Sequence, residues 1–195
     1  IIIGGPGATK AYVVKNDYFH HEIKKLIREP FFDVGYSNES GLRELIQRAG
    51  GLMDQIELDV ERKIVDSFLR EVMQAHPKAT YGEVMIRAAL EQGAVDRLLL
   101  SENITDRRVS WICKSCGEEW EATQKRRSEL PVCKSCSSDD IKENQQKSMD
   151  LIDELTIIAG RTSASVTLVS MDTEEGATLY EAFGGIAALL RYPLS

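Results

Sequence analysis

Two Cys-x-x-Cys pairs constrain the fold of this 195-residue chain more than any other feature of its sequence. Cys113 and Cys116 form the first pair, Cys133 and Cys136 form the second, and these are all four cysteines of the chain. Two thiolates separated by two residues can point at one centre, and two such pairs supply the four sulfur ligands that tetrahedral Zn²⁺ prefers. The sixteen residues between the pairs fall within the usual spacing of a zinc ribbon. We therefore predict a zinc site made of these four side chains.

The sequence leaves three alternatives to a metal site open: a reactive dithiol, disulfides and inert thiols. The start of the sequence does not resemble a signal peptide, so we expect an intracellular chain, in which such pairs more often bind metal or react than form structural disulfides. A redox role needs one pair, whereas two are present. Zinc is therefore the favoured interpretation.

The predicted zinc has a structural role. Because four protein thiolates complete the tetrahedron, no coordination position stays open for water or substrate. Lys114 and Lys134 lie inside the two pairs, where we expect them to offset the formal charge of about −2 on the site. Gly117 follows the first pair and suits the left-handed turn that closes such a knuckle.

The charge balance favours protein partners over nucleic acid. The chain has 24 basic and 31 acidic residues, a net charge of −7, which argues against a protein that coats phosphate backbones. Two basic runs, Arg107-Arg108 and Lys125-Arg126-Arg127, lie in or beside the cysteine segment. We interpret them as solvated faces, with RNA contact as the alternative. No apolar run is long enough to span a membrane, so we expect no membrane partner.

The first ten residues predict a strand and a tight turn into a helix. Ile1 to Gly5 has the composition of a buried strand, and because the chain starts with Ile instead of Met we expect a piece of a longer protein. The following Pro6 to Lys10 resembles a phosphate-binding loop. A Walker loop requires glycine where Thr9 stands, and a dinucleotide fingerprint requires glycine where Lys10 stands, so we favour the structural turn.

Apolar periodicity predicts several elements in the first third of the chain. We expect a helix over residues 21–28 that Pro30 stops, a strand over 31–36, one helix over 42–56 that passes through Gly50-Gly51, and a further helix over 64–72. A charged run separates the last two apolar stripes. We therefore place a domain boundary near residues 55–59, between two helices, and assign residues 1–57 and 58–195 to two domains.

Helices and strands alternate in the second domain. A capping box at Thr80 to Glu83 predicts a helix that ends at Gly93, and a strand follows over residues 94–100. After the cysteine segment we expect a helix over residues 149–159, a strand over 165–169, a helix capped by Asp172 or Thr173, and a final strand over 186–192.

The predicted fold is α/β. We expect two α/β domains, the second an α/β sandwich with an inserted zinc-ribbon minidomain at residues 108–142. This insertion is too short to build a core of its own. Metal ligation would supply the missing stabilisation, on the order of 10 kcal/mol in small zinc peptides.

The residues do not predict an enzyme active site. His20, His21 and His76 are the three histidines of the chain, and no Gly-x-Ser-x-Gly, His-Glu-x-x-His or metal-spaced aspartate motif accompanies them. The carboxylates are scattered over expected helix faces. We therefore expect structural roles for the histidines and no catalysis by these residues.

The end of the chain resembles a family signature. Residues 183–192 read Phe-Gly-Gly-Ile-Ala-Ala-Leu-Leu-Arg-Tyr, which resembles the Phe-Gly-Gly-Ile-x-x-x-Leu-Arg-Tyr ending of class-1 peptide chain release factors of the archaeal and eukaryotic type. The helix-to-strand segment at residues 89–103 and the turn at residues 5–10 resemble segments of the same family. The resemblance follows the order of the family over nearly the whole chain.

The resemblance implies a part of a three-domain protein. In this family an N-terminal domain reads stop codons, a middle domain carries a Gly-Gly-Gln loop that promotes peptidyl-tRNA hydrolysis, and a C-terminal domain docks partners. The chain resembles the later part of the middle domain, at residues 1–57, and the whole C-terminal domain, at residues 58–195. None of its three Gly-Gly pairs is followed by glutamine.

The resemblance also implies cofactor and partners. Archaeal-type members carry a four-cysteine zinc minidomain, which matches Cys113, Cys116, Cys133 and Cys136. The implied partners are an elongation-factor-type GTPase, an ABC-type ribosome recycling ATPase and the ribosome, all in the cytoplasm. The C-terminal domain of the family shares its sandwich with ribosomal proteins that bind kink-turn RNA.

Two rival functions remain. A Pelota-type ribosome rescue factor resembles this family in both domains and lacks peptide release, but the zinc insertion and the Leu-Arg-Tyr ending favour the release factor. A free-standing zinc-ribbon RNA-binding module is the rival from a different class, and the acidic net charge disfavours it.

Overall fold

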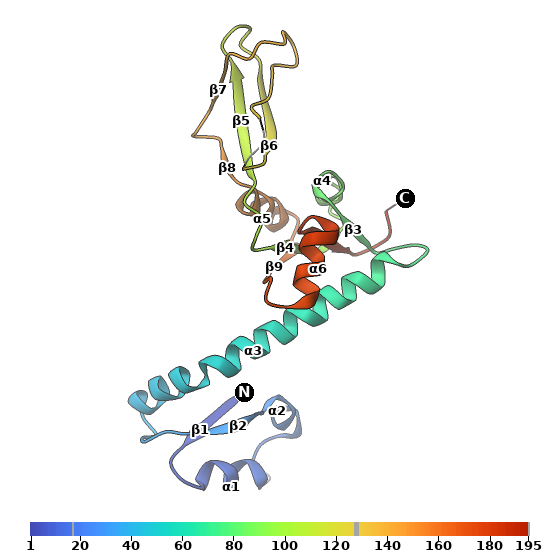
Figure 1. The fold of residues 1–195 in the computed structure, drawn as a ribbon. Helices are drawn as coiled ribbons and strands as arrows, with labels where there is room; N and C mark the ends of the chain where they lie inside the picture. Colours follow the sequence, from blue (N-terminus) through green and yellow to red (C-terminus); the bar gives the residue numbers. More distant parts are fainter. Residues whose placement is uncertain (17, 127–128, 195) are drawn as a thin grey trace. The chain divides into compact units, whose positions relative to one another are not determined.

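The computed structural model describes residues 1–16, 18–126 and 129–194. They divide into two compact units, Ile1–Asp59 and Val60–Ser195. Figure 1 traces the helices and strands of both units. Within the described residues, no helix combines the length and the apolar character needed to cross a membrane.

The first unit contains a two-stranded parallel sheet. Strand β1 (Ile2–Gly5) pairs with β2 (Arg28–Asp33), and helices α1 (Thr9–Lys15) and α2 (His21–Leu26) lie between them in the sequence. The strand predicted at residues 31–36 therefore begins and ends three residues earlier than expected. Its limits follow from its partner, because the N–H of Arg28 donates to the carbonyl of Ile1, and Pro30 is tolerated since β2 is an edge strand.

The turn after β1 has the structural role predicted for it. The Nζ of Lys10 lies 2.5 Å from Asp33 Oδ1 and 2.6 Å from the carbonyl oxygen of Gly7. The lysine side chain is 11% exposed, so its charge is already neutralised inside the unit. This lysine connects the turn to β2, so it has a structural role in a loop whose sequence resembles a phosphate-binding site.

Helix α3 (Glu39–Val72) is one helix of 34 residues. The prediction that the apolar stripe runs through Gly50-Gly51 without a break is confirmed. The prediction of two helices separated near residues 55–59 is wrong, because the helix continues through this stretch and the division between the units falls inside it. The charged residues there are good helix formers, and a change from apolar to charged composition does not by itself end a helix.

The second unit is built on a four-stranded sheet, which we call the core sheet. Its order is β3 (Ala79–Tyr81), β10 (Ile186–Leu190), β4 (Val95–Ser101) and β9 (Ser165–Val169). Strand β10 is antiparallel to both of its neighbours, whereas β4 and β9 are parallel. The sheet therefore has the mixed α/β character expected from the sequence.

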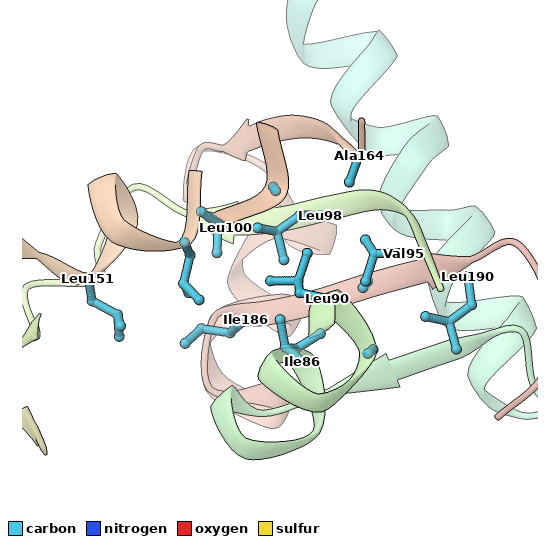
Figure 2. Packing of buried hydrophobic residues seen from close by; sticks show 13 residues of the cluster. Ile86, Leu90, Val95, Leu98, Leu100, Leu151, Ala164, Ile186 and Leu190 are labelled. Carbon is cyan, nitrogen blue, oxygen red and sulfur yellow. The ribbon is translucent and has the colours of Figure 1, made fainter. Parts of the chain in front are cut away.

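Helices cover both faces of the core sheet. On one face α4 (Glu83–Glu91) and α5 (Leu151–Arg161) bury apolar side chains against β4 and β10, and Figure 2 shows Ile86 and Leu90 of α4 close to Leu98 of β4. On the other face, α3 and α6 (Glu174–Phe183) pack Phe68 and Leu179 into a second cluster. The side chains of β4 contribute to both clusters, since successive residues of a strand point to opposite faces.

The capping box predicted at Thr80 to Glu83 is wrong. Thr80 belongs to β3, where it pairs with Ala188 of β10, and Gly82 with a φ of 80° stands at the N-terminus of α4 without a side-chain cap. Pairing with β10 competes with the local capping interaction and prevails. The other cap prediction holds, because the Thr173 hydroxyl accepts a hydrogen bond from the N–H of Gly176 at the start of α6.

The cysteine segment forms a separate sheet, which we call the ribbon lobe. It consists of β5 (Arg107–Cys113), β6 (Glu119–Gln124), β7 (Ile141–Glu143) and β8 (Met149–Asp150). Strands β6, β7 and β8 each pair with β5 in antiparallel orientation. Met149 therefore belongs to the lobe and not to the helix predicted from residue 149, which begins at Leu151. The lobe is inserted between β4 and α5 of the core sheet unit.

The C-terminal signature has structural roles in this unit. The Phe183 ring lies edge-on to Phe68 and Tyr81, with centroids 5.1 and 5.0 Å apart. Gly184 ends α6 in the left-handed region with a φ of 72°. The guanidinium of Arg191 donates to the carbonyl oxygens of Gly93, Thr162 and Ser163 and so joins the turn after α4 to the turn after α5.

We expect Arg191→Lys to destabilise the second unit. Lysine cannot reproduce the planar fork that reaches three carbonyl oxygens, and we expect a loss of about 1 kcal/mol at this exposed position. Hydrogen exchange of the β4 and β10 amides measures it. Arg161→Lys, at an exposed arginine in the last turn of α5, is the matched control. Equal exchange in the two variants contradicts the assigned role.

We expect the first unit to exchange its amide hydrogens much faster than the second. Among its described residues only Val34 and Ala49 are buried apolar side chains, whereas both apolar clusters lie in the second unit. Few buried contacts mean a low free energy of local opening. Exchange of the intact chain followed by mass spectrometry tests this, and similar protection in β2 and β4 contradicts it.

Candidate metal centre

The first cysteine pair lies at the end of β5 in a closed backbone turn. The N–H of Gly117 donates to the carbonyl of Cys113 over 2.9 Å, and the N–H of Cys113 donates to the carbonyl of Glu118, also over 2.9 Å. Gly117 has a φ of 78°, so the left-handed conformation predicted for it is confirmed.

The second pair repeats this turn. The N–H of Ser137 donates to the carbonyl of Cys133 over 2.8 Å, and the N–H of Cys133 donates to the carbonyl of Ser138 over 2.9 Å. Ser137 has a φ of 55°, which is uncommon for a residue with a side chain. Its left-handed conformation could have been predicted from its position, because Ser137 follows the second pair as Gly117 follows the first. The two knuckles are therefore equivalent in backbone geometry.

The knuckles bring the four sulfur atoms together. All four Sγ atoms lie within 4.8 Å of one another, with Cys113 and Cys136 3.5 Å apart and Cys116 and Cys133 3.6 Å apart. None of the four is in a disulfide. A tetrahedral Zn²⁺ with Zn–S bonds of about 2.3 Å requires sulfur atoms about 3.8 Å apart. The donor set and its spacing therefore fit zinc.

The surroundings shift the pKa values of the thiols in opposite directions. A hydrogen bond from the backbone N–H of Cys116 lowers the pKa of Cys113 to about 6. The backbone N–H of Glu118 favours the thiolate of Cys116, but hydrogen bonding with Cys136 and Cys113 outweighs it and raises the pKa of Cys116 to about 12. The Cys113 thiolate forms readily, and the pKa of Cys116 and that of Cys136 are raised. A divalent cation would stabilise all four thiolates.

Each knuckle contributes one buried and one exposed cysteine. Cys113 and Cys133 are buried, whereas Cys116 and Cys136 are exposed. Between the knuckles, the hydroxyls of Ser115 and Ser138 are 2.9 Å apart. The ammonium of Lys114 lies 2.6 Å from Asp140 Oδ1, so part of the charge expected to offset the site is shared with a carboxylate. Lys134 is exposed.

The first of the two basic runs beside the cysteines is paired with carboxylates. Arg107 forms an ion pair with Glu143 at 3.1 Å, and Arg108, whose side chain is 22% exposed, faces Glu83, Glu121 and Glu154. The interpretation as a solvated face is therefore wrong for Arg108 but holds for Arg107, whose side chain is 46% exposed. Both guanidinium groups are paired with carboxylates, which weakens the RNA alternative. Of the second run, Arg126 is exposed and Arg127 lies outside the described residues.

Comparison with family models assigns the whole chain to known domains. Residues 1–57 match the model described as eRF1 domain 2, and residues 58–194 match eRF1 domain 3. Among curated proteins, peptide chain release factor subunit 1 of Archaeoglobus fulgidus is 41% identical over 192 residues. That alignment covers 98% of this chain but 46% of the relative, so the chain spans about half the length of the proteins it matches.

Two solved structures place the fold. The C-terminal domain of peptide chain release factor from Methanosarcina mazei matches with a TM-score of 0.67 and 38% identity, over 81% of this chain and 98% of that one. An archaeal Pelota, described as ribosome-bound together with ABCE1, matches the whole chain and 43% of its own with a TM-score of 0.56. Its identity is 21%, so this second likeness concerns the fold.

We expect about one zinc per chain, held by the four cysteines. Cys116→Ser or Cys133→Ser should abolish binding, because three thiolates do not complete the tetrahedron, and should unfold residues 108–142 locally while the core sheet stays folded. Elemental analysis and hydrogen exchange measure the two effects. Ser115→Ala, inside the same knuckle, should keep its zinc. Absence of metal from protein purified without chelator contradicts the site.

Proposed function

The chain belongs to the eRF1 family of peptide chain release factors, and we propose that it is the partner-docking part of an archaeal-type factor that ends translation at stop codons. One observation carries the proposal: the two family models run over the chain from residue 1 to residue 194 without a gap. The 41% identity to an archaeal release factor subunit extends over the same residues. In the complete protein, this activity is recognition of the stop codon and promotion of peptidyl-tRNA hydrolysis.

We assign residues 1–57 to the end of the middle domain and residues 58–195 to the C-terminal domain, with the minidomain at 108–142. Gly-Gly occurs at residues 4–5, 50–51 and 184–185, followed by Pro6, Leu52 and Ile186. A Gly-Gly-Gln loop is thus absent from this sequence. We accordingly propose that these residues perform no catalysis and that their contribution to termination is binding.

The proposed partners are an elongation-factor-type GTPase, an ABC-type recycling ATPase and the ribosome. Support comes at the level of the fold, since a Pelota that is described as ribosome-bound with ABCE1 shares it. A yeast Dom34 described as interacting with Hbs1 shares it too, with a TM-score of 0.55. The acidic net charge of −7 is consistent with binding through protein surfaces.

The four cysteines have a structural role in this proposal. A zinc ion held by both knuckles would brace the ribbon lobe, and four thiolates leave it no open position for a reacting molecule. We further propose that the sandwich of the second domain is of the kind found in kink-turn-binding ribosomal proteins.

Pelota-type rescue is the alternative function. The fold alone does not separate it from termination, because both kinds of protein match. The sequence favours termination, with 41% and 38% identity to release factors against 21% to the archaeal Pelota. A Gly-Gly-Gln motif in the sequence upstream of these residues decides between the two. A stand-alone RNA-binding zinc ribbon is disfavoured by the paired charges of Arg107 and Arg108.

We expect the chain to bind the GTPase partner but to release no peptide. Purified chain is added to ribosomes stalled at a stop codon, and release of labelled peptide is compared with that by a complete archaeal release factor. Binding to the GTPase is measured by calorimetry. Release by the chain alone overturns the domain assignment, and failure to bind the GTPase overturns the docking role. If the chain neither releases peptide nor binds the GTPase but binds RNA with a salt-dependent affinity, the result supports the stand-alone RNA-binding module.

A further inference from the structure

A cluster of charged side chains connects the ribbon lobe to the core sheet unit. Its members come from three elements that are distant in the sequence: Glu83 and Arg87 from α4, Arg108 from β5 and Glu154 from α5. Their side chains are 16–22% exposed, so the charges are partly desolvated. The cluster is separate from the cysteines and has no part in the proposed metal site.

Arg87 forms the tight part of the cluster, within the core sheet unit. Its Nε donates to Glu83 Oε1 over 2.8 Å, and its two Nη atoms donate to the oxygens of Glu154 over 3.0 and 2.5 Å. This bidentate geometry fixes α4 and α5 against each other. It also leaves both glutamates carrying a negative charge toward the lobe.

Arg108 forms the loose part of the cluster and belongs to the lobe. Its guanidinium nitrogens lie 3.8 Å from Glu83, 3.6 Å from Glu154 and 3.5 Å from the lobe's own Glu121. The Nε atom is buried and has no hydrogen-bond partner. At these distances the attraction between Arg108 and the carboxylates depends on charge and separation and hardly on angle. The Nη1 of Arg108 also donates a long hydrogen bond, 3.5 Å, to the Thr123 hydroxyl within the lobe.

A direct hydrogen bond accompanies these ion pairs. The Thr123 hydroxyl of β6 donates to Glu83 Oε1. The lobe also meets the unit at its two chain connections, where the N–H of Leu151 donates to the carbonyl of Asp106 over 3.0 Å. Glu83 belongs to α4, an element that carries neither connection, so the contacts to it can restrain how the lobe tilts.

We propose that Arg108 is the positioning residue that sets the orientation of the ribbon lobe, and that it acts as a point charge between carboxylates of α4 and α5. The inference does not depend on the proposed function. Removal of the charge leaves Glu83 and Glu154 facing the lobe with one cation, Arg87, for two carboxylates. The lobe then loses its ion pairs to α4 and α5, and the hydrogen bond from Thr123 to Glu83 does not by itself keep it from tilting about its two chain connections.

Arg107 provides the matched control. It precedes Arg108 in β5 and therefore points to the opposite face of the strand. Its ion pairs, 3.1 Å to Glu143 and 3.9 Å to Asp150, both join it to strands of the lobe itself. Replacement of Arg107 removes the same charge from the same strand without removing an ion pair to Glu83 of α4 or Glu154 of α5.

Residual dipolar couplings of the intact, zinc-loaded chain test the proposal. We expect lobe and core sheet amides of the wild type to fit one alignment tensor. In Arg108→Gln the magnitude of the lobe tensor should fall to about half that of the core sheet or less, whereas Arg107→Gln should match the wild type. Zinc content must be equal in all variants, which separates a tilt from unfolding of the lobe.

Arg108→Lys separates a point charge from a geometric clamp. The distances from Arg108 to Glu83 and Glu154 exceed hydrogen-bond length, so a lysine that carries the same charge should restore the wild-type lobe tensor. If Arg108→Gln leaves the lobe tensor unchanged, or Arg107→Gln reduces it equally, the positioning role is overturned. If Arg108→Gln reduces it and lysine fails to restore it, the point-charge mechanism is overturned. Should Arg108→Gln not fold, Glu83→Gln with Thr123→Val tests the same bridge from the side of α4.

Discussion

Convergence of four sulfur atoms on one centre is the constraint on which the ribbon lobe depends. Among the described residues of the lobe, five side chains are buried, namely Val109, Ser110, Trp111, Cys113 and Cys133. Two of these five are cysteines of the proposed site, so the lobe has almost no apolar core apart from it. A cation bound by four thiolates can replace such a core, because its binding free energy becomes folding free energy.

The core sheet tolerates this insertion because the lobe enters and leaves at one place. Arg107 and Asp150 pair across β5 and β8, at the point where the chain leaves β4 and returns to α5. Strand β4 precedes the insertion and β9 follows it, yet the two strands pair without interruption from Arg97 to Ser101 of β4. An insertion whose two ends lie together adds little strain to the core sheet unit. The lobe can therefore be stabilised separately, while the unit keeps its two apolar clusters.

The sequence was most informative where one local rule acts alone. The left-handed turn at Gly117, the strand at residues 165–169 and the cap at Thr173 were predictable from spacing and local chemistry. Prediction failed where a residue distant in the sequence determines the local conformation or the ion pairing. Thr80 joins a strand because β10 lies beside it, and Arg108 is paired because α4 and α5 present glutamates to it. Neither partner is near in sequence, so no local pattern could reveal it.

The signature that first indicated the family is explained by packing. A Cβ on Gly185 would lie 3.1 Å from side-chain atoms of Ser101 and Tyr180, and its φ of 76° disfavours a side chain as well. Tyr192 donates from its hydroxyl to the carbonyl of Gln92, beside the turn that Arg191 holds. These residues specify how α6 passes into β10 and how β10 meets the turns around it. The signature therefore indicates a particular packing of this junction. Identity spread along the whole chain, 41% to a release factor subunit, supports the family assignment independently of this junction.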